Sequence, residues 1–262
     1  MASCGRLAIG SVLAHEVSGR QKRFPRTAQN IADKLGPMEA APTRLIDYFS
    51  GFKQNLVPLF QRPYTWSEKQ WRTLWEDVMA FYPSDDVSDK ATHFMGAVVT
   101  MPARSVPVGV SKYLIIDGQQ RLTTVSLLMC ALRDSLGPDP QGPRNRIQQF
   151  YLTNFGYEGS DFFKLLPTQG DRDAYASLIR EPIGSVPESQ FRKSYDFFKR
   201  RLRDTADDGE KVDPKRVLEI LEKRLMVVMI NLSEADDPYL ILKASTSRVR
   251  HWSRRISFAI TS

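Results

Sequence analysis

The segment YLIIDGQQRLTTVSLLMCALRDSL, residues 113–136, joins a short apolar run to a longer one through a polar junction. Residues 113–117 have the length and composition of a buried strand, whereas the run from Gln119 to about Leu136 is long enough for a helix. Gly118 supplies the turn between them. We therefore predict a strand–turn–helix unit with the motif DGQQR, residues 117–121, where the strand meets the helix.

The DGQQR motif has the chemistry of an anion site. The first N–H groups of a helix lack intrahelical partners and carry partial positive charge, and a glycine lets a ligand approach the backbone closely. Arg121 adds a planar guanidinium that matches phosphate oxygens. Gln119 and Gln120 can orient a ligand or a water molecule, and Asp117 can hold a ribose hydroxyl, a metal-bound water or the guanidinium. The alternative is a plain turn in which Asp117 caps the helix and Arg121 forms a surface ion pair.

A second polar group interrupts an apolar stretch upstream, in FQRPYTW at residues 60–66. Gln61 and Arg62 are followed by Tyr64 and Trp66, whose rings we expect to be exposed. Aromatic rings beside an arginine can form a stacking wall for a nucleotide. The alternative is that the two rings only attach this segment to the next helix. Two Gln–Arg pairs in one small unit favour the interpretation that both face one pocket.

The rest of the chain reads as mainly helical. A capping box at Ser67 and Gln70 opens one helix, whose apolar positions follow the spacing of a single buried face. The expected helices are 43–50, 67–82, 143–154, 171–180, 189–205 and 213–223, the expected strands besides 113–117 are 93–101 and 225–232, and 55–66 is extended. Two short groups of strands within a helical majority predict a small α/β unit followed by a helical extension.

The net charge of +7 is concentrated at the two ends of the chain. Residues 1–37 carry +4 and residues 242–262 carry +5, whereas residues 38–241 carry −2. DNA binding by this central part would therefore need a local basic patch. The stretches RNR at 144–146 and FFKRRLR at 197–203 are candidates, and the alternative for the second is a solvated helix face.

Several classes of protein do not fit the composition. No stretch approaches the roughly 20 consecutive apolar residues of a membrane span, and the start lacks the continuous apolar run of a secretory signal. Cys130 lies in an apolar helical pattern and reads as a core residue, and Cys4 is the one other cysteine. We expect a cytoplasmic protein without membrane contact and without a metal-ligand cluster.

Three segments in a fixed order carry a family resemblance. FQRPYTWSEKQWRTLWEDV, HFMGAVV and IIDGQQRLTTVSLLMCALRD resemble the N-terminal domain of GmrSD-type modification-dependent restriction enzymes, and the same domain is similar to that of the phosphorothioate-sensing restriction protein SspE. The similarity continues through FFKLLPTQGDRDAYASLI and RLMVVMINLSEADDPYLI and so covers roughly 43–241. The resemblance implies an α+β fold, with a small ParB/sulfiredoxin-like mixed sheet and helices in a nucleotide-binding unit at 38–140. A mainly helical extension of the same domain at 141–241 would follow it.

The resemblance also implies an activity: binding and hydrolysis of a nucleoside triphosphate with Mg²⁺, which licenses DNA cleavage. The residues carried over as catalytic, around the phosphates, are Asp117, Gln119, Gln120 and Arg121. Those carried over as cofactor-binding are Gly118 at the turn and Gln61, Arg62, Tyr64 and Trp66 along the adjoining wall. The expected partners are DNA, in modified form, and an HNH-type nuclease domain or subunit. Because the histidines His15, His93 and His251 are too widely separated for such a nuclease, we expect it to be absent from this chain.

Two other functions stay open at this point. The chain would bind modified DNA as a sensor without hydrolysis if the aromatic–arginine wall contacts DNA, or it would be an inactive truncated fragment. The second alternative follows from the tail at 242–262, which is basic and free of acids, and whose codons, shifted by one base, permit the continuation expected from the family. We expect an out-of-frame tail after about Ile241. Residues 1–37 show no period, and we expect them to be disordered or to precede a true start at Met38.

Overall fold

The computed structural model describes residues 39–82, 92–103, 109–139, 141–180, 187–205, 209, 211–233 and 236. Within these residues, six strands form one sheet in the order β1-β6-β3-β4-β2-β5. The strands are β1 (Glu39–Arg44), β2 (Lys53–Leu56), β3 (His93–Pro102), β4 (Ser111–Asp117), β5 (Leu165–Leu166) and β6 (Leu225–Asn231). The sheet is mixed, since β3 is antiparallel to β4 and parallel to β6, and β2 is parallel to both β4 and β5. The predicted α+β class is confirmed.

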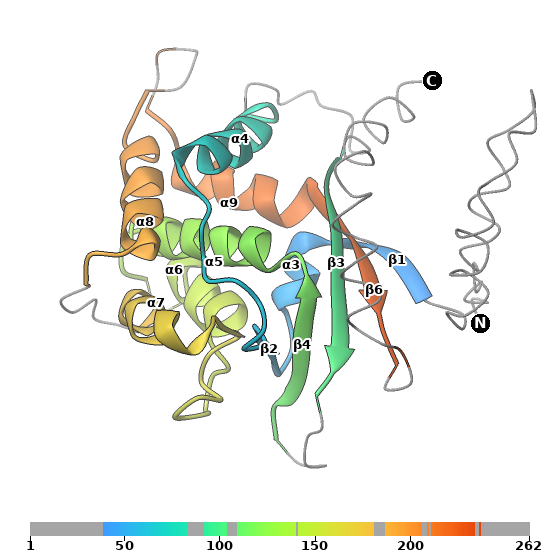
Figure 1. The fold of residues 1–262 in the computed structure, drawn as a ribbon. Helices are drawn as coiled ribbons and strands as arrows, with labels where there is room; N and C mark the ends of the chain where they lie inside the picture. Colours follow the sequence, from blue (N-terminus) through green and yellow to red (C-terminus); the bar gives the residue numbers. More distant parts are fainter. Residues whose placement is uncertain are drawn as a thin grey trace, which may run out of the picture.

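The helices lie together on one face of this sheet (Figure 1). They are α3 (Leu45–Phe49), α4 (Glu68–Met79), α5 (Gln119–Arg133), α6 (Pro143–Arg146), α7 (Arg172–Ile179), α8 (Gln190–Arg201) and α9 (Pro214–Lys223), with a π-helical turn at Ile147–Leu152 and a 3₁₀ turn at Gln169–Asp171. Their apolar faces form one large core with the sheet. Val99, Ile116 and Leu232 form a second, small apolar cluster. In the part of the chain that the structure describes, no helix is long and apolar enough to cross a membrane.

Helix α5 is the centre of this core. All of its residues from Leu122 to Arg133 are buried, so the helix has no polar face toward solvent. A helix that is buried on all sides must be enclosed by other elements, and α5 is packed against α7, α8, α9 and the π-helical turn. The long helix predicted after Gly118 is therefore confirmed, and it ends three residues before the predicted Leu136.

The end of α5 is held by Arg133, whose side chain is completely buried. Its guanidinium is paired with Asp134 at 2.7 Å and also donates to Gln148 Oε1 and to the carbonyl oxygens of Leu178 and Ile179. A buried cation is tolerated only when its charge and its donors are satisfied, as they are here. Arg133 thus connects α5 to the end of α7 and to the π-helical turn.

Most elements expected from the sequence are present. Gln70 Oε1 accepts a hydrogen bond from the backbone N–H of Ser67 at 3.0 Å, which confirms the capping box at the start of α4. Strand β1, strand β5 and the π-helical turn were not expected from the sequence. Strand β6 comes from the predicted helical extension and lies between β1 and β3, so 141–241 contributes to the sheet itself. The division at residue 140 stays a prediction, and the expectations for 1–37 and 242–262 lie outside the described residues.

Replacing Leu128 by alanine tests the role of α5 as the core helix. Leu128 is 0% exposed, so the change should lower the free energy of unfolding by about 2–5 kcal/mol through lost burial and the cavity left behind. The same change at Leu59, which is 78% exposed, should alter it by less than about 0.5 kcal/mol. Urea denaturation of both variants measures the difference, and similar losses in the two would contradict this description of the core.

Candidate functional site

The DGQQR motif lies where β4 passes into α5, as predicted. Strand β4 ends at Asp117, and α5 begins at Gln119. Gly118 has a φ of +95°, and a Cβ atom there would lie 3.2 Å from Val98 Cγ2 and 3.3 Å from the Ala97 carbonyl oxygen. Both the backbone conformation and the close approach to β3 therefore require glycine at this turn.

The first turn of α5 is not capped by a side chain. Asp117 Oδ1 accepts a hydrogen bond from the N–H of Gly118 at 2.8 Å, one residue before the helix begins. The alternative in which Asp117 caps the helix is therefore not what the structure shows. The N–H groups of residues 119–121 keep the partial positive charge of a helix start, beside the carboxylate of Asp117.

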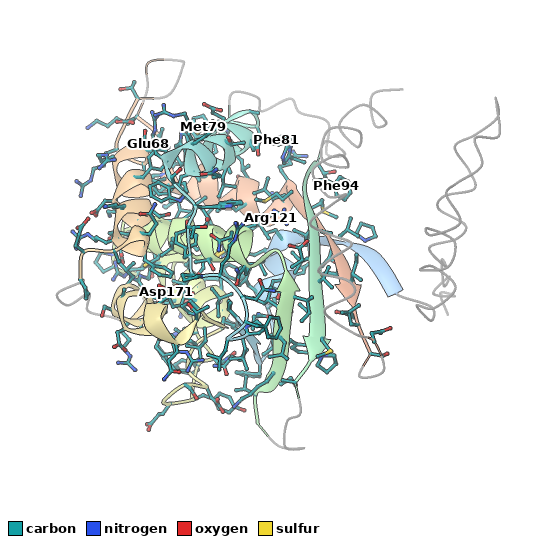
Figure 2. The ribbon with its side chains drawn as sticks, in the orientation of Figure 1. Glu68, Met79, Phe81, Phe94, Arg121 and Asp171 are labelled. Atoms are coloured by element: carbon teal, nitrogen blue, oxygen red, sulfur yellow. The ribbon has the colours of Figure 1, made fainter. Side chains whose placement is uncertain are left out.

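Arg121 turns back from α5 onto β3 (Figure 2). Its Nη1 donates to the Ala97 carbonyl oxygen at 2.8 Å. Gly96 makes room for the guanidinium, because a Cβ atom at this position would lie 3.0 Å from Nη2. Gly96 has a φ of +100° and sits where the pairing of β3 with β6 shifts register between Phe94 and Ala97. The Arg121 guanidinium therefore lies against a β-bulge in β3.

Arg121 forms no direct ion pair with a described carboxylate, although the charge of Asp117 acts on it from a greater distance. Its side chain is partly buried, and in lacking an ion pair it differs from Arg133. Burial lowers the pKa of Arg121, and the negative charge of Asp117 opposes this shift. The alternative of a surface ion pair is therefore not observed. A desolvated cation held by a carbonyl oxygen and facing a helix start is suited to an anionic ligand.

Gln120 joins the two predicted motifs. Its Nε2 donates to the Pro63 carbonyl oxygen at 2.9 Å, and its Oε1 accepts from the N–H groups of Thr65 and Trp66 at 2.8 and 3.2 Å. Both the nitrogen and the oxygen of this buried amide are thus hydrogen-bonded to the backbone of FQRPYTW. Gln120 therefore joins the two segments that carry the Gln–Arg pairs, and the idea that both pairs face one pocket stays a prediction.

Gln119 is bonded at one end only. Its Nε2 donates to the Arg62 carbonyl oxygen at 3.0 Å, but its buried Oε1 has no hydrogen-bond partner in the structure. Gln119 borders a pocket of about 10 Å³, roughly the space of one water molecule. The pocket is lined by Val57, Arg62, Tyr64, Gln119, Gln120, Thr123, Pro167, Thr168 and Asp171. A buried acceptor without a donor is unusual and indicates a missing water or ligand group.

The predicted aromatic wall needs a correction. The expected exposure of Tyr64 is wrong, because its ring is buried and packs 5.0 Å from the ring of Phe191, centroid to centroid. Its hydroxyl lies 2.7 Å from Thr124 Oγ1 and accepts a hydrogen bond from Trp71 Nε1 at 2.7 Å. Trp66 is partly buried against the core. The Tyr64 ring therefore attaches this segment to neighbouring helices, which is the alternative given above for the aromatic rings.

The other residues of the wall are closer to solvent. Arg62 is exposed and borders the small pocket. Gln61 is partly buried, and its Nε2 donates to the Ile116 carbonyl oxygen of β4 at 2.8 Å. Gln61 and Arg62 therefore lie beside the end of β4 and the start of α5, as expected.

Asp171 is a member of the site that the sequence reasoning missed. Its Oδ2 accepts hydrogen bonds from the N–H of Tyr64 at 3.1 Å and from Thr168 Oγ1 at 2.9 Å. It precedes α7, far along the chain from FQRPYTW, and is labelled in Figure 2. The only signal in the sequence is a polar turn, TQGD, after the apolar LL of β5.

The basic stretches proposed as DNA contacts are partly engaged within the protein. In RNR, Arg146 pairs with Glu222 at 3.0 Å. In FFKRRLR, Lys199 Nζ donates to the Asp134 carbonyl oxygen at 2.8 Å, and Arg201 lies 3.5 Å from a carboxylate oxygen of Asp204. These contacts use part of the positive charge of both stretches within the protein, so less of it is available for DNA.

Two further features lie apart from the DGQQR motif. His93 Nε2 is 3.3 Å from a carboxylate oxygen of Asp77, so this histidine connects β3 to α4. A larger hollow of about 420 Å³ lies between α4 and α8 and is lined by Glu68, Trp71, Glu188, Gln190, Lys193, Asp196 and Arg200. It contains none of the predicted site residues and mixes both signs of charge.

Comparison with known families agrees with the order of motifs. The family model described as GmrSD restriction endonuclease, N-terminal domain, matches residues 45–246. The chain belongs to this family. The GmrSD N-terminal domain match includes β2 to β6, α3 to α9, FQRPYTW and DGQQR. No curated protein matches the chain significantly.

The two glutamines should differ in their contribution to stability. Gln120→Ala should lower the free energy of unfolding by about 2–4 kcal/mol, because it removes three hydrogen bonds and leaves backbone groups of FQRPYTW without partners. Gln119→Ala should cost about 1 kcal/mol or less, since it removes one hydrogen bond and also an unpaired buried oxygen. Urea denaturation compares them; an equal or larger loss for Gln119→Ala would contradict these assignments.

Glycine at position 96 should be required for the observed position of the Arg121 guanidinium. Gly96→Ala and Gly109→Ala both place alanine at a positive φ, of +100° and +119°, at a cost of about 1–3 kcal/mol each. At Gly109 nothing lies within 4 Å of the new Cβ, whereas at Gly96 the guanidinium must move. We expect an additional loss of about 1–3 kcal/mol at Gly96 in thermal unfolding. Equal losses would show that Arg121 is not confined there.

Proposed function

We propose that this chain binds a nucleoside triphosphate at DGQQR, hydrolyses it, and acts as the regulatory domain of a DNA restriction system. The observation that carries the proposal is the unpaired, partly buried guanidinium of Arg121 beside the uncapped first turn of α5. Two sources of positive potential converge there without an ion pair to a described carboxylate. Phosphate oxygens supply the matching negative charge.

Arg121 would hold the phosphates together with the start of α5. Of its donors, only Nη1 has an acceptor among the described residues, the Ala97 carbonyl oxygen. This single bond fixes the orientation of the guanidinium and leaves its other N–H groups for phosphate oxygens. The N–H groups of the uncapped first turn of α5 can donate to the same oxygens.

Gln119 would position the attacking water. Both ends of the Gln120 amide are used by FQRPYTW, whereas Gln119 Oε1 is free and borders a pocket of about one water molecule. An amide oxygen can accept a hydrogen bond from water and so orient it, although it is too weak a base to remove its proton. The two glutamines of DGQQR therefore have different roles in this proposal.

Asp117 is the residue at the junction that fits Mg²⁺. Its Oδ1 is engaged by Gly118, and its Oδ2 has no hydrogen bond with a described residue. Mg²⁺ in nucleotide sites is commonly held by one or two carboxylates together with phosphate oxygens, so the lack of a larger cluster of ligands among the described residues is compatible with it. When bound, the ion would neutralise charge on the phosphates.

The family match supports a role for this site in a restriction system. The family is the N-terminal domain of a restriction endonuclease, which supports a role in restriction of foreign DNA. We propose that nucleotide turnover at DGQQR licenses cleavage of modified DNA by an HNH-type nuclease domain or subunit. The second predicted function, a sensor without hydrolysis, has weaker support because the basic stretches are engaged internally.

Arg121→Ala tests the binding step in the full-length chain. Each nucleoside triphosphate with Mg²⁺, at about 100 times its dissociation constant, should stabilise the parent by about 2.7 kcal/mol, a rise of several degrees in Tm. The rise should disappear in Arg121→Ala and persist in Arg72→Ala, an exposed arginine paired with Glu68 on α4. A cooperatively folded parent with no rise for any nucleotide would overturn the proposal.

Gln119→Ala tests the hydrolytic step. It should keep the nucleotide-dependent rise in Tm but lower phosphate release by roughly 100-fold or more, because the water loses its acceptor. Phosphate release is measured with a coupled colorimetric assay on the full-length chain. Unchanged release in Gln119→Ala would exclude this residue from the reaction and leave Arg121 as a binding residue only.

A further inference from the structure

A group of aromatic and basic residues lies at the other end of the sheet from DGQQR. Strands β2 and β4 are parallel and paired, with Lys53 beside Ser111 at their first residues, whereas DGQQR follows the last residue of β4 (Figure 1). The group consists of Phe52, Lys53, Tyr157 and Lys164, which we call the basic–aromatic cluster. It shares no residue with the site described above.

The two lysines of the cluster have no acidic partner among the described residues. Lys164 is 2% exposed, and its ammonium donates to the Gly51 carbonyl oxygen. Lys53 is partly exposed, with Nζ 4.8 Å from the centroid of the buried Tyr48 ring. Burial lowers the pKa of both lysines, and the charge of Lys53 further lowers the pKa of Lys164, to about 8. Two like charges held near each other are unfavourable unless an anion compensates them.

Among the described residues, the nearby carboxylates form no ion pair with either lysine: burial lowers the pKa of Lys53, and the charge of Asp47 opposes this shift without contacting Nζ. Asp161 pairs with Lys112 at 2.9 Å, and Asp47 pairs with Arg44 at 2.8 Å. Glu158 is exposed on the same loop as Tyr157 and forms no ion pair with a described residue. The positive charge of the cluster therefore remains available at the surface through Lys53.

Of the aromatic rings of the cluster, Phe52 is exposed to solvent and Tyr157 is partly buried beside it. Phe52 is 60% exposed, and its ring centroid lies 5.7 Å from that of Tyr157 at an interplanar angle of 55°. Lys164 Nζ lies 5.9 Å from the Phe52 ring, so this ring covers the buried ammonium. A large apolar side chain with this exposure, next to a cation, is typical of a surface on which a planar group stacks.

Buried amides hold the cluster in place. Asn154, which is 0% exposed, donates to the Lys53 carbonyl oxygen at 3.2 Å and to the Asp161 carbonyl oxygen at 2.9 Å. Gln54 donates to the Phe163 carbonyl oxygen at 3.1 Å. These bonds attach the loop that carries Tyr157 to β2, so the rings and the lysines are positioned by the sheet rather than by a free loop.

We propose that the basic–aromatic cluster binds one unstacked nucleotide of single-stranded nucleic acid. The phosphate would be held by Lys53, with the charge of Lys164 beneath it, and the base would stack on Phe52 with Tyr157 beside it. Paired lysines and an exposed ring match the alternation of phosphate and base along a strand. The bases of a duplex do not expose their faces, so the cluster should distinguish single strands from duplexes.

The test uses the full-length chain and fluorescence anisotropy with a labelled 12-nucleotide single strand of mixed sequence, its duplex, and unlabelled nucleoside monophosphate as competitor. The parent should bind the single strand at least about 10-fold more tightly than the duplex. Phe52→Ala should weaken single-strand binding by roughly 10-fold, and Phe52→Trp should retain it. Lys53→Gln should weaken single-strand binding and reduce the slope of log K against log salt by about 0.7. The control variant Lys215→Gln, on the exposed surface of α9, should reduce both the affinity and the slope less.

The controls separate this proposal from nucleotide binding at DGQQR. Arg121→Ala should bind the single strand as the parent does, and Glu158→Gln should bind it somewhat more tightly because a nearby negative charge is removed. Melting curves identify any variant that does not fold, and because Phe52 is exposed we expect both of its variants to melt as the parent does. Equal affinity of the parent, Phe52→Ala and Lys53→Gln would overturn the proposal and assign strand binding to the basic ends of the chain. Competition by monophosphate as strong as by the strand would also overturn it, in favour of a free-nucleotide site.

Discussion

The burial of α5 is the constraint on which the rest of the structure depends. Because this helix is enclosed by α7, α8, α9 and the π-helical turn, its first turn cannot move toward solvent, and its polar residues must find partners where they emerge. Three segments distant in sequence supply the surroundings: the bulge of β3 at Gly96, the FQRPYTW loop, and the turn that ends at Asp171. The site is therefore built into the core packing rather than added to a surface loop.

Within this arrangement the polar residues of DGQQR divide into two kinds. Gln120 uses its whole amide to bind the FQRPYTW loop, and Asp171 holds the same loop from the other side through Tyr64. Within the described residues, Gln119 keeps an acceptor oxygen without a hydrogen bond, and Arg121 uses only Nη1 of its guanidinium as a donor. Both residues lie beside the uncapped start of α5. Native structures rarely leave buried polar capacity unused without a functional reason, so these two residues define the ligand-facing side of the motif.

Much of this could be predicted from the sequence, because the signals involved are local. The strand–turn–helix at Gly118, the capping box of α4 and the buried face of that helix follow from periodicity and from short-range hydrogen bonds. The residues that escaped prediction act over long range. Tyr64 looked exposed because nothing nearby in sequence shows that Phe191 and Thr124 enclose it. The functions of Gly96 and of the carboxylate before α7 depend likewise on partners about 25 and 107 residues away.

The central claim is that the unpaired charge of Arg121 is held for the phosphates of a nucleotide. The most direct measurement is a crystal structure of the full-length chain with Mg²⁺ and a non-hydrolysable nucleoside triphosphate. The account predicts phosphate oxygens at about 2.7–3.1 Å from the guanidinium of Arg121 and from the N–H groups at the start of α5, with Gln119 Oε1 facing the terminal phosphate. A nucleotide bound elsewhere, such as in the hollow between α4 and α8, with Arg121 still unpaired, would contradict it.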